Sequence, residues 1–302
     1  MKAAEPTRLV IGFSPGSLSD RIARALTASL SDELSESVEV SGRPGENGTL
    51  AAREVARARP DGRTLFVATL GTHALACHVD RALPYEPLRD FAPVALVAQA
   101  PLLLACHPGV PARSTAELVA LARKRPRALT YASSAIGGAP HLAAELFQAC
   151  TGVELRHVCY ARTEQLYRDL EAGEVMLSFN NIVSMLPVCR RGALGALGVT
   201  SASRSDLAPD VPALQEEGIT GYEVTNWAGI VAPRGTPEAR IARLAAAVNA
   251  ALQSAEVRDA WGAAGMIAPL STPASFSTFI TTEIDRWRAV AARLDSQAER
   301  RV

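Results

Sequence analysis

The stretch RLVIGFSPGSLSDRIARALTASLSDEL, residues 8–34, carries the strongest fold signal in the chain. Its first six residues are an apolar run that predicts a buried strand. From residue 20 onward, apolar side chains recur at helical spacing, at Ile22, Ala23, Leu26, Leu30 and Leu34. A turn at residues 13–20 (FSPGSLSD) joins the two elements. A strand, a turn and a helix in this order predict an α/β fold with a mostly parallel sheet.

The same order of elements recurs along the chain. Further strands are predicted at residues 37–40, 64–68, 102–106, 130–132, 155–158, 175–179, 194–199 and 223–231. The chain then ends on helices, predicted at residues 239–252, 256–264 and 274–294. A length of 302 residues favours two domains. We place a break near Leu102 and a return to the first domain near Trp227.

The composition excludes several classes of function. Lys plus Arg equals Asp plus Glu at 31 each, so the chain lacks the basic excess typical of nucleic-acid binding. The apolar fraction of 48% is enough for a sizeable core. The apolar stretches at residues 94–106 and 227–232 are too short or too interrupted for a membrane span and predict buried strands. The five cysteines have no CxxC spacing, so we expect buried thiols rather than a metal or redox site.

The start of the chain leaves two locations open. Residues 1–8 lack the apolar segment of a signal peptide. This is compatible with a cytoplasmic protein, or with an exported protein whose leader has been removed. The polar residues 2–6, directly before the first strand, favour the second alternative.

Three turns share a position that is typical of ligand sites. The turns at residues 13–20 and 133–141, and the pair Asn180 and Asn181, each follow a predicted parallel strand and precede a helix. Ligands bind at this edge of open α/β sheets, where helix starts direct N–H groups toward an anion. One such turn alone is more often a plain connection. The chain has neither a Walker motif nor a GxGxxG turn after its first strand, so the three turns together predict a carboxylate site.

Motifs for catalysis are weak. There is no GxSxG elbow and no HExxH motif, and the five histidines are scattered over different elements. His141 opens a helix, and a capping or packing role is favoured over ligand contact. For His73, which follows a strand, a ligand role and a structural role are equally favoured. We therefore predict no catalytic residues and no metal site.

Two more residues have alternative roles. Asp20 begins the first helix, where a cap that holds the turn in shape is favoured over direct contact with a carboxylate. It would accept a hydrogen bond from the ammonium group of an amino-acid ligand. Among the three tryptophans, Trp227 is the one for which a ligand role competes with burial in the core.

Several longer stretches resemble one family. They include PDGRTL at residues 60–65, LPYEPLRDFAPV at 83–94, LTYASSAIGGAPHLAAELF at 129–147, and PDVPAL at 209–214 followed by GYEV at 221–224. Together with the first turn they resemble the Bug-type proteins, which are extracytoplasmic solute receptors of tripartite tricarboxylate transporters. The resemblance covers about residues 6–294.

The resemblance implies a type II periplasmic-binding-protein fold, in which two α/β lobes are joined by two crossing strands and close on a ligand in the cleft between them. It assigns residues 1–103 and 226–302 to the first lobe and residues 104–225 to the second. It also implies a periplasmic location, no cofactor and no reaction, so we expect a protein that is not an enzyme. We expect a monomer.

The resemblance further implies a set of ligand-binding residues. In this family the ligand carboxylate is typically held by backbone amides, hydroxyls and water from the first turn and from the turn after the second lobe's first strand. Mapped by motif, the set is Phe13, Ser14, Gly16, Ser17, Leu18, Ser19, Asp20, Leu70, Gly71, Thr72, Ser133, Ser134, Ile136, Gly137, Tyr160, Ala161 and Asn180.

The sequence also departs from the family pattern. Ser14 and Ser17 replace a proline and a glycine of the usual first turn, and residues 157–162 read HVCYAR where HVPYKG is usual. Arg162 either grips a carboxylate or is solvated, and solvation is favoured. The ligand is left open among dicarboxylates, tricarboxylates, aromatic acids and acidic amino acids or their cyclised forms. The expected function is capture of a small carboxylate for a membrane transporter; a sensory module that signals to a sensor kinase is the alternative, and an enzyme on this fold is the least favoured.

Overall fold

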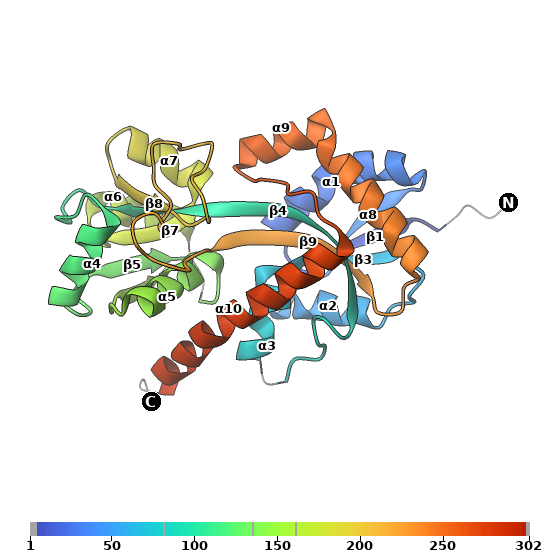
Figure 1. Ribbon diagram of the computed structural model, residues 1–302, viewed down its shortest axis with the longest axis horizontal. Helices are drawn as coiled ribbons and strands as arrows, with labels where there is room; N and C mark the ends of the chain where they lie inside the picture. Colours follow the sequence, from blue (N-terminus) through green and yellow to red (C-terminus); the bar gives the residue numbers. More distant parts are fainter. Residues whose placement is uncertain (1–4, 81, 135, 161, 300–302) are drawn as a thin grey trace. The chain divides into compact units, whose positions relative to one another are not determined.

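The computed structural model describes residues 5–80, 82–134, 136–160 and 162–299. The chain forms two compact units: unit 1 comprises Met1–Gln99 and Trp227–Val302, and unit 2 comprises Ala100–Asn226. Two strands run from one unit into the other, β4 (Phe91–Cys106) and β9 (Thr225–Pro233), both labelled in Figure 1. The expected lobe boundaries, after residue 103 and before residue 226, fall within these strands.

Unit 1 contains three parallel strands, in the order β2 (Val38–Gly42), β1 (Thr7–Ile11) and β3 (Thr64–Thr69). Strand β9 pairs antiparallel with β3 and is followed in the sheet by β4. The helices of this unit are α1 (Leu18–Leu34), α2 (Thr49–Ala56), α3 (Ala76–Val79), α8 (Glu238–Gln253), α9 (Ala255–Ala264) and α10 (Pro273–Glu299). Strand β1 and helix α1 confirm the strand and the helix predicted from residues 8–34.

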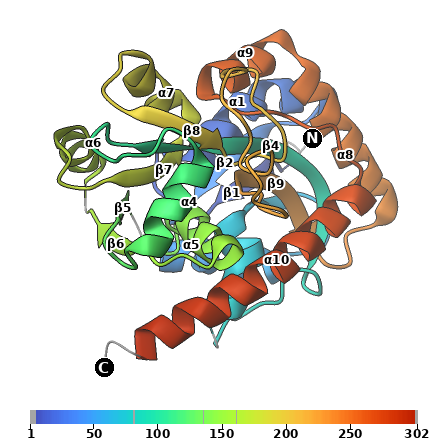
Figure 2. The ribbon, with the colours of Figure 1, turned by 60° about the vertical axis from the view of Figure 1, so that its left-hand side comes forward.

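Unit 2 repeats this arrangement around three parallel strands, in the order β7 (Leu177–Asn181), β5 (Thr130–Ser133) and β6 (Arg156–Cys159). Strand β4 pairs antiparallel with β7 and with β8 (Gly195–Val199). Helices α4 (Thr115–Lys124), α5 (Ala139–Thr151), α6 (Thr163–Ala172) and α7 (Ile182–Arg190) complete the unit. Helix α5 covers one face of these strands, and α6 and α7 cover the other (Figures 1 and 2).

The sheet is mixed, whereas a mostly parallel sheet was expected. The antiparallel partners are the two strands that run between the units, together with β8. The expected parallel pairing holds within each unit, for β1, β2 and β3 and for β5, β6 and β7, which are connected through helices. Directly after β3, residues Gly71–Leu75 form a π-helix that continues into α3.

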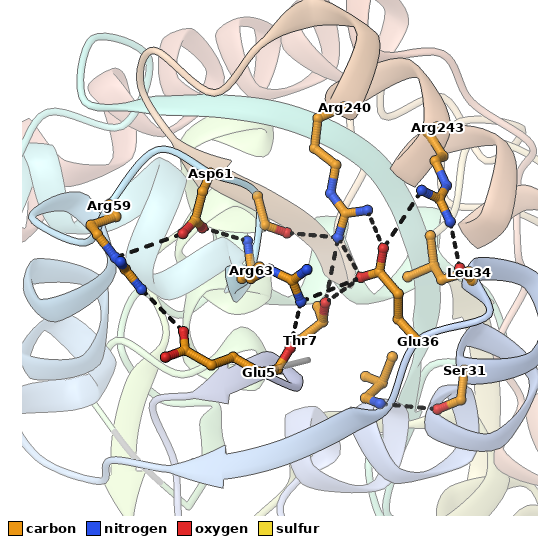
Figure 3. A network of polar contacts seen from close by, with 12 residues as sticks. Glu5, Thr7, Ser31, Leu34, Glu36, Arg59, Asp61, Arg63, Arg240 and Arg243 are labelled. Carbon is orange, nitrogen blue, oxygen red and sulfur yellow. Dashed lines mark hydrogen bonds and ion pairs between the residues drawn. The ribbon is translucent and has the colours of Figure 1, made fainter. Parts of the chain in front are cut away.

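A polar network ties helix α8 to the start of the chain in unit 1 (Figure 3). The carboxylate of Glu36 accepts two hydrogen bonds of 2.8 Å from the Arg240 guanidinium and one of 3.0 Å from the Thr7 hydroxyl. Arg240 also donates to the carbonyl of Gly62. The Glu36 and Arg240 side chains are only 16% and 14% exposed. The hydrogen bonds from Arg240 lower the pKa of Glu36 to about 2, so this carboxylate is charged at neutral pH.

The structure decides the role that was left open for Trp227 and corrects the expectation that the cysteines are buried. Trp227 is fully buried, its indole N–H donates to Glu283 Oε2 at 2.9 Å, and the Phe276 and Phe279 rings lie edge-on to it. It is therefore a core residue rather than a ligand platform. The cysteines are free thiols, but only Cys106 is buried, whereas Cys77 and Cys189 are half-buried and Cys150 and Cys159 are exposed. Within the described part of the chain, no helix is both long enough and apolar enough to cross a membrane.

Candidate functional site

In unit 1, the three segments that follow the parallel strands leave the same edge of the sheet. Because β2, β1 and β3 are parallel, their carboxyl ends meet at one edge. Residues 43–48 follow β2, residues 12–17 follow β1, and residues 70–75 follow β3. The first turn and the Leu70, Gly71 and Thr72 segment, both predicted as ligand walls, therefore lie at this edge.

The first turn is held by Asp20 from within helix α1. Gly16 has a left-handed φ of +83°, and its N–H donates to Asp20 Oδ2 at 2.8 Å. Asp20 Oδ1 accepts a hydrogen bond of 2.8 Å from Arg24 Nε. The helix cap is Ser17, whose hydroxyl accepts from the N–H of Asp20. Asp20 therefore holds the turn in shape, as predicted, but it does so from the third position of the helix and not as its cap.

The residues of this turn differ in their access to solvent. Ser14 and Gly16 are exposed, and Phe13, Ser17 and Leu18 are half-buried. Ser19 and Asp20 are buried. The turn therefore presents a hydroxyl and backbone groups to solvent, while its carboxylate points inward and already accepts hydrogen bonds from the protein.

The segment after β3 is a buried wall. Thr72 is fully buried: its hydroxyl accepts from the N–H of Thr69 at 3.0 Å, and its carbonyl accepts from the Tyr85 hydroxyl at 2.7 Å. Leu70 is also buried, and Gly71 is half-buried. His73 is stacked among aromatic rings, and burial lowers its pKa to about 3, so it is a neutral residue of the core. Of the two roles left open for His73, the structure supports the structural one.

Gly48 lies in the segment that follows β2, at the same edge of the sheet, although it is not among the predicted ligand-binding residues. A Cβ atom at this position would lie 2.8 Å from Thr72 Cγ2 and 3.1 Å from Phe13 Cε2. A Cβ atom at Gly12 would lie 2.6 Å from the Cα of Gly48. The loop after β2 thus packs directly on two of the predicted ligand walls. Its RPGENG sequence indicates a turn, but nothing in that pattern indicates where the turn packs.

Replacing Gly48 with alanine should destabilise the protein by roughly 1–3 kcal/mol and shift Phe13. The φ of Gly48 is +88°, and the new methyl would displace Thr72 or the Phe13 ring. Gly235→Ala is the matched control, because Gly235 has the same φ of +88° and its nearest neighbour would be Pro60 Cβ at 3.8 Å. Thermal unfolding of both variants measures the difference. Equal destabilisation would show that only backbone strain matters and would remove the packing argument.

In unit 2, the predicted residues lie at the carboxyl ends of β5, β6 and β7. Ser133 ends β5, and its carbonyl accepts from the N–H of Tyr160 at 2.9 Å. Asn180 lies in β7 opposite Leu103, and its side-chain oxygen accepts from the N–H of Asn181. Because the three strands are parallel neighbours, these residues share one edge. Ala161 lies outside the described residues.

Between β5 and α5 the structure describes Ser134 and residues 136–138, and these residues are exposed or half-buried. Ser134 is exposed, and the Ile136 side chain is 69% exposed. Gly137 has a left-handed φ of +78°, and its N–H donates to His141 Nδ1 at 3.2 Å. At the end of β5, the hydroxyl of the fully buried Ser133 lies 2.7 Å from His157 Nε2. The histidines therefore support the loop, which agrees with the favoured packing role of His141.

Of the residues that follow β6, Tyr160 is neutral and Arg162 is exposed to solvent. Tyr160 is half-buried, and burial, together with the Asp169 carboxylate, raises its pKa to about 12, so it is a neutral hydrogen-bonding group. The side chain of Arg162 is 81% exposed and lies 3.9 Å from Glu164, which matches the favoured solvated role.

The two edges offer hydroxyls and backbone N–H groups rather than reactive groups. Ser133 and His157 are as close as a nucleophile and its base, but Ser133 is fully buried and so is not presented to a substrate. Among the described residues, no group of three His, Cys, Asp or Glu side chains could hold a metal ion. Neutral donors at strand ends are suited to binding an anion.

Comparison with known proteins identifies the family of this chain. The profile of the family described as "Tripartite tricarboxylate transporter family receptor" matches residues 22–295. The protein BugT of Bordetella pertussis is 33% identical over 288 residues, which are 95% of this chain and 88% of BugT. Among solved structures, the Rpa4515 protein of R. palustris with adipate is 36% identical with a TM-score of 0.77, covering 95% of this chain and 96% of that one. MatC from Rhodopseudomonas palustris with bound malate is 33% identical with a TM-score of 0.76, covering 95% and 98%.

These similarities extend over almost the whole chain and both units. They include relatives above 30% identity and solved structures with the same two-lobe fold. The chain therefore belongs to the family of tripartite tricarboxylate transporter receptors, whose members are solute-binding proteins.

Proposed function

We propose that this protein captures a small dicarboxylate and passes it unchanged to a membrane transporter. The observation that carries the proposal is that two relatives, 36% and 33% identical over 95% of the chain, are solved with adipate and with malate. Both ligands have two carboxylates on a short aliphatic chain. A transporter receptor must meet its solute on the side of the membrane from which the solute is imported, so we place this protein in the periplasm.

The binding would draw on the strand-end loops of both units. In unit 1, Ser14 and Gly16 are exposed and Ser17 is partly exposed, and in unit 2 Ser134 is exposed and Gly137 is partly exposed. The serines offer hydroxyls, which bind carboxylates without adding a charged partner, whereas the N–H groups of Gly16 and Gly137 already donate to Asp20 and His141 and hold the loops in shape. The buried residues Asp20, Thr72 and Ser133 would shape the loops rather than contact the ligand.

A thermal-shift panel of organic acids tests this function. A ligand at 100 times its Kd should stabilise the folded protein by about 2.7 kcal/mol, so adipate or malate at millimolar concentration should raise the Tm. Adipamide is the matched control: it has the same carbon chain, but its two ends are neutral amides. We expect a shift with at least one dicarboxylate and none with the diamide. A panel in which neutral sugars or cations raise the Tm and no acid does so would refute the carboxylate function.

A further inference from the structure

Five exposed cations gather at the edge of the unit 2 sheet where β5 and β6 begin. We call this surface the basic edge; its residues are Arg123, Lys124, Arg125, Arg127 and Arg156. Residues 123–129 and 151–156 contain these five cations and a single carboxylate, Glu154, and the neighbouring strand β7 is preceded by one more, Glu174. The whole chain has a formal net charge of zero. The basic edge is therefore a local excess of positive charge on a neutral protein.

Hydrogen bonds hold the two segments of the basic edge side by side. The N–H of Arg127 donates to the carbonyl of Glu154 at 2.9 Å, and the N–H of Arg156 donates to the carbonyl of Leu129 at 2.9 Å. The Arg123 guanidinium donates to the carbonyl of the last residue of α5, also at 2.9 Å. Figure 1 shows α4, α5 and β5 next to one another. The five cations therefore share one surface of unit 2.

The charges of these side chains are not neutralised within the described part of the chain. None of the five forms an ion pair with a described residue, and the bond from Arg123 to a carbonyl is the one hydrogen bond that their side chains donate to such residues. Other exposed arginines of unit 2 differ, because Arg191 pairs with Glu171 and Arg204 pairs with Glu216. The basic edge thus keeps its charges available for a partner.

Local stability accounts for some of these cations but not for Arg127. Arg123, Lys124 and the cap residue Arg125 lie at the carboxyl end of α4, where the helix dipole favours positive charge. Arg127 has a left-handed φ of +61°, a conformation that glycine adopts without steric cost and that residues with a side chain adopt with strain. A cation therefore stands at a position that the backbone alone would leave to glycine.

The surface chemistry favours a layer of charged groups over a protein partner. Protein interfaces are usually centred on apolar and aromatic side chains. Among the described residues, the large apolar side chains that are exposed are Ile136, Ile267 and Leu270, and none of them belongs to the basic edge. Clustered lysines and arginines bind anionic lipid headgroups without such a centre, because each cation adds its own attraction to the charged surface.

We propose that the basic edge binds the anionic lipid headgroups of a membrane surface. The basic edge lies where the parallel strands β5 and β6 begin, whereas the candidate ligand residues of unit 2 lie at the carboxyl ends of the same strands. A membrane that covers the basic edge therefore leaves the candidate ligand edge of this unit uncovered. This inference rests on the proposed function, because a protein that passes its solute to a membrane transporter works beside a membrane.

The first experiment measures co-sedimentation of the full chain with lipid vesicles, in the absence of any dicarboxylate. One set of vesicles contains equal parts of phosphatidylcholine and phosphatidylglycerol, and the other contains phosphatidylcholine alone. We expect binding to the anionic vesicles only. This binding should fall as the salt concentration rises from 0.01 M to 0.15 M, because the Debye length shortens from about 30 Å to about 8 Å. Equal binding to both sets of vesicles, or binding to neither, would overturn the proposal.

A pair of double variants tests whether the basic edge carries the binding. Each cation near an anionic membrane contributes roughly fivefold in affinity, so Arg125→Gln combined with Arg156→Gln should weaken binding about 25-fold. Arg57→Gln combined with Arg258→Gln is the matched control, because both arginines are exposed in unit 1 and the change in net charge is the same. The control should bind as the wild type does. An equal loss in the two double variants would show that only net charge matters and would refute the inference.

Arg127→Gly separates membrane binding from stability. Glycine suits the left-handed φ, so the variant should keep the Tm of the wild type while its affinity for the anionic vesicles falls roughly fivefold. Wild-type affinity in Arg127→Gly would contradict a role for this cation in the surface. If the wild type ignores the vesicles but binds polyglutamate, the basic edge is a site for acidic protein segments and the membrane proposal is wrong. These assays contain no dicarboxylate, so their failure leaves solute capture standing, and a failed thermal-shift panel leaves vesicle binding standing.

Discussion

Replacing Arg240 with methionine is expected to lower the free energy of unfolding by about 3 kcal/mol, because it leaves a carboxylate without its partner in a largely buried site. Arg240 gives Glu36 two hydrogen bonds of 2.8 Å and donates to Gly62 as well (Figure 3). Methionine keeps most of the apolar stem and removes the guanidinium. Urea unfolding at neutral pH measures the loss.

The same helix offers a matched control in Arg243. The Arg243 guanidinium lies 3.6 Å from Glu36 Oε1, which also accepts a hydrogen bond from Arg240, but the Arg243 side chain is 55% exposed. Exposed ion pairs contribute at most about 1 kcal/mol, so Arg243→Met should cost much less than Arg240→Met. If the two variants lose the same free energy of unfolding, the buried pair of Glu36 and Arg240 contributes no more to stability than an exposed pair.

The hydrogen bonds between Arg240 and Glu36 also predict that the folded protein loses stability in acid. Glu36 has a folded-state pKa of about 2 against an ordinary value of 4.5. A lowered pKa stabilises the folded state fully above the ordinary value, and this stabilisation is lost as the pH falls from about 4.5 toward about 2. It amounts to something on the order of 3 kcal/mol. In Arg240→Met most of this pH dependence should disappear, whereas in Arg243→Met it should persist.

Replacing Ser134 with tryptophan should weaken ligand binding by at least roughly 100-fold while leaving the fold intact. Ser134 is exposed directly after β5, so an indole there adds bulk where a ligand would approach without disturbing the core. Ala128→Trp is the matched control, because Ala128 is exposed before the start of the same strand. It should bind ligand as the wild type does. If Ser134→Trp keeps both its Tm and its affinity, the β5–α5 loop does not belong to the site.

The positions of the loops could be predicted from the sequence, because they depend on local patterns. Residues 8–13 and the helical spacing from Ile22 to Leu34 specify a strand, a turn and a helix, and parallel strands place such turns at one edge. The turn at 13–20 was therefore placed correctly. The same pattern of strand, turn and helix indicated the matching turn of unit 2 at residues 133–141.

The contacts that shape these loops could not be predicted, because they join residues on different elements. Gly48 reads as part of an ordinary turn, and only its approach to Thr72 and Phe13 reveals its role. Likewise, the sequence spacing of Asp20 and His141 suits a helix start, but it does not show that each side chain reaches back to a glycine N–H. Trp227 was left open between ligand and core because its partner Glu283 is 56 residues away.

Isothermal titration with the dicarboxylate that gives the largest thermal shift tests whether this receptor binds a small dicarboxylate through loops at the ends of its parallel strands. We expect one molecule of acid to bind per wild-type chain, with no binding to Ser134→Trp at the same concentrations and full binding to Ala128→Trp. Titrations in which no dicarboxylate binds the wild type, or in which Ser134→Trp binds as tightly, would contradict it.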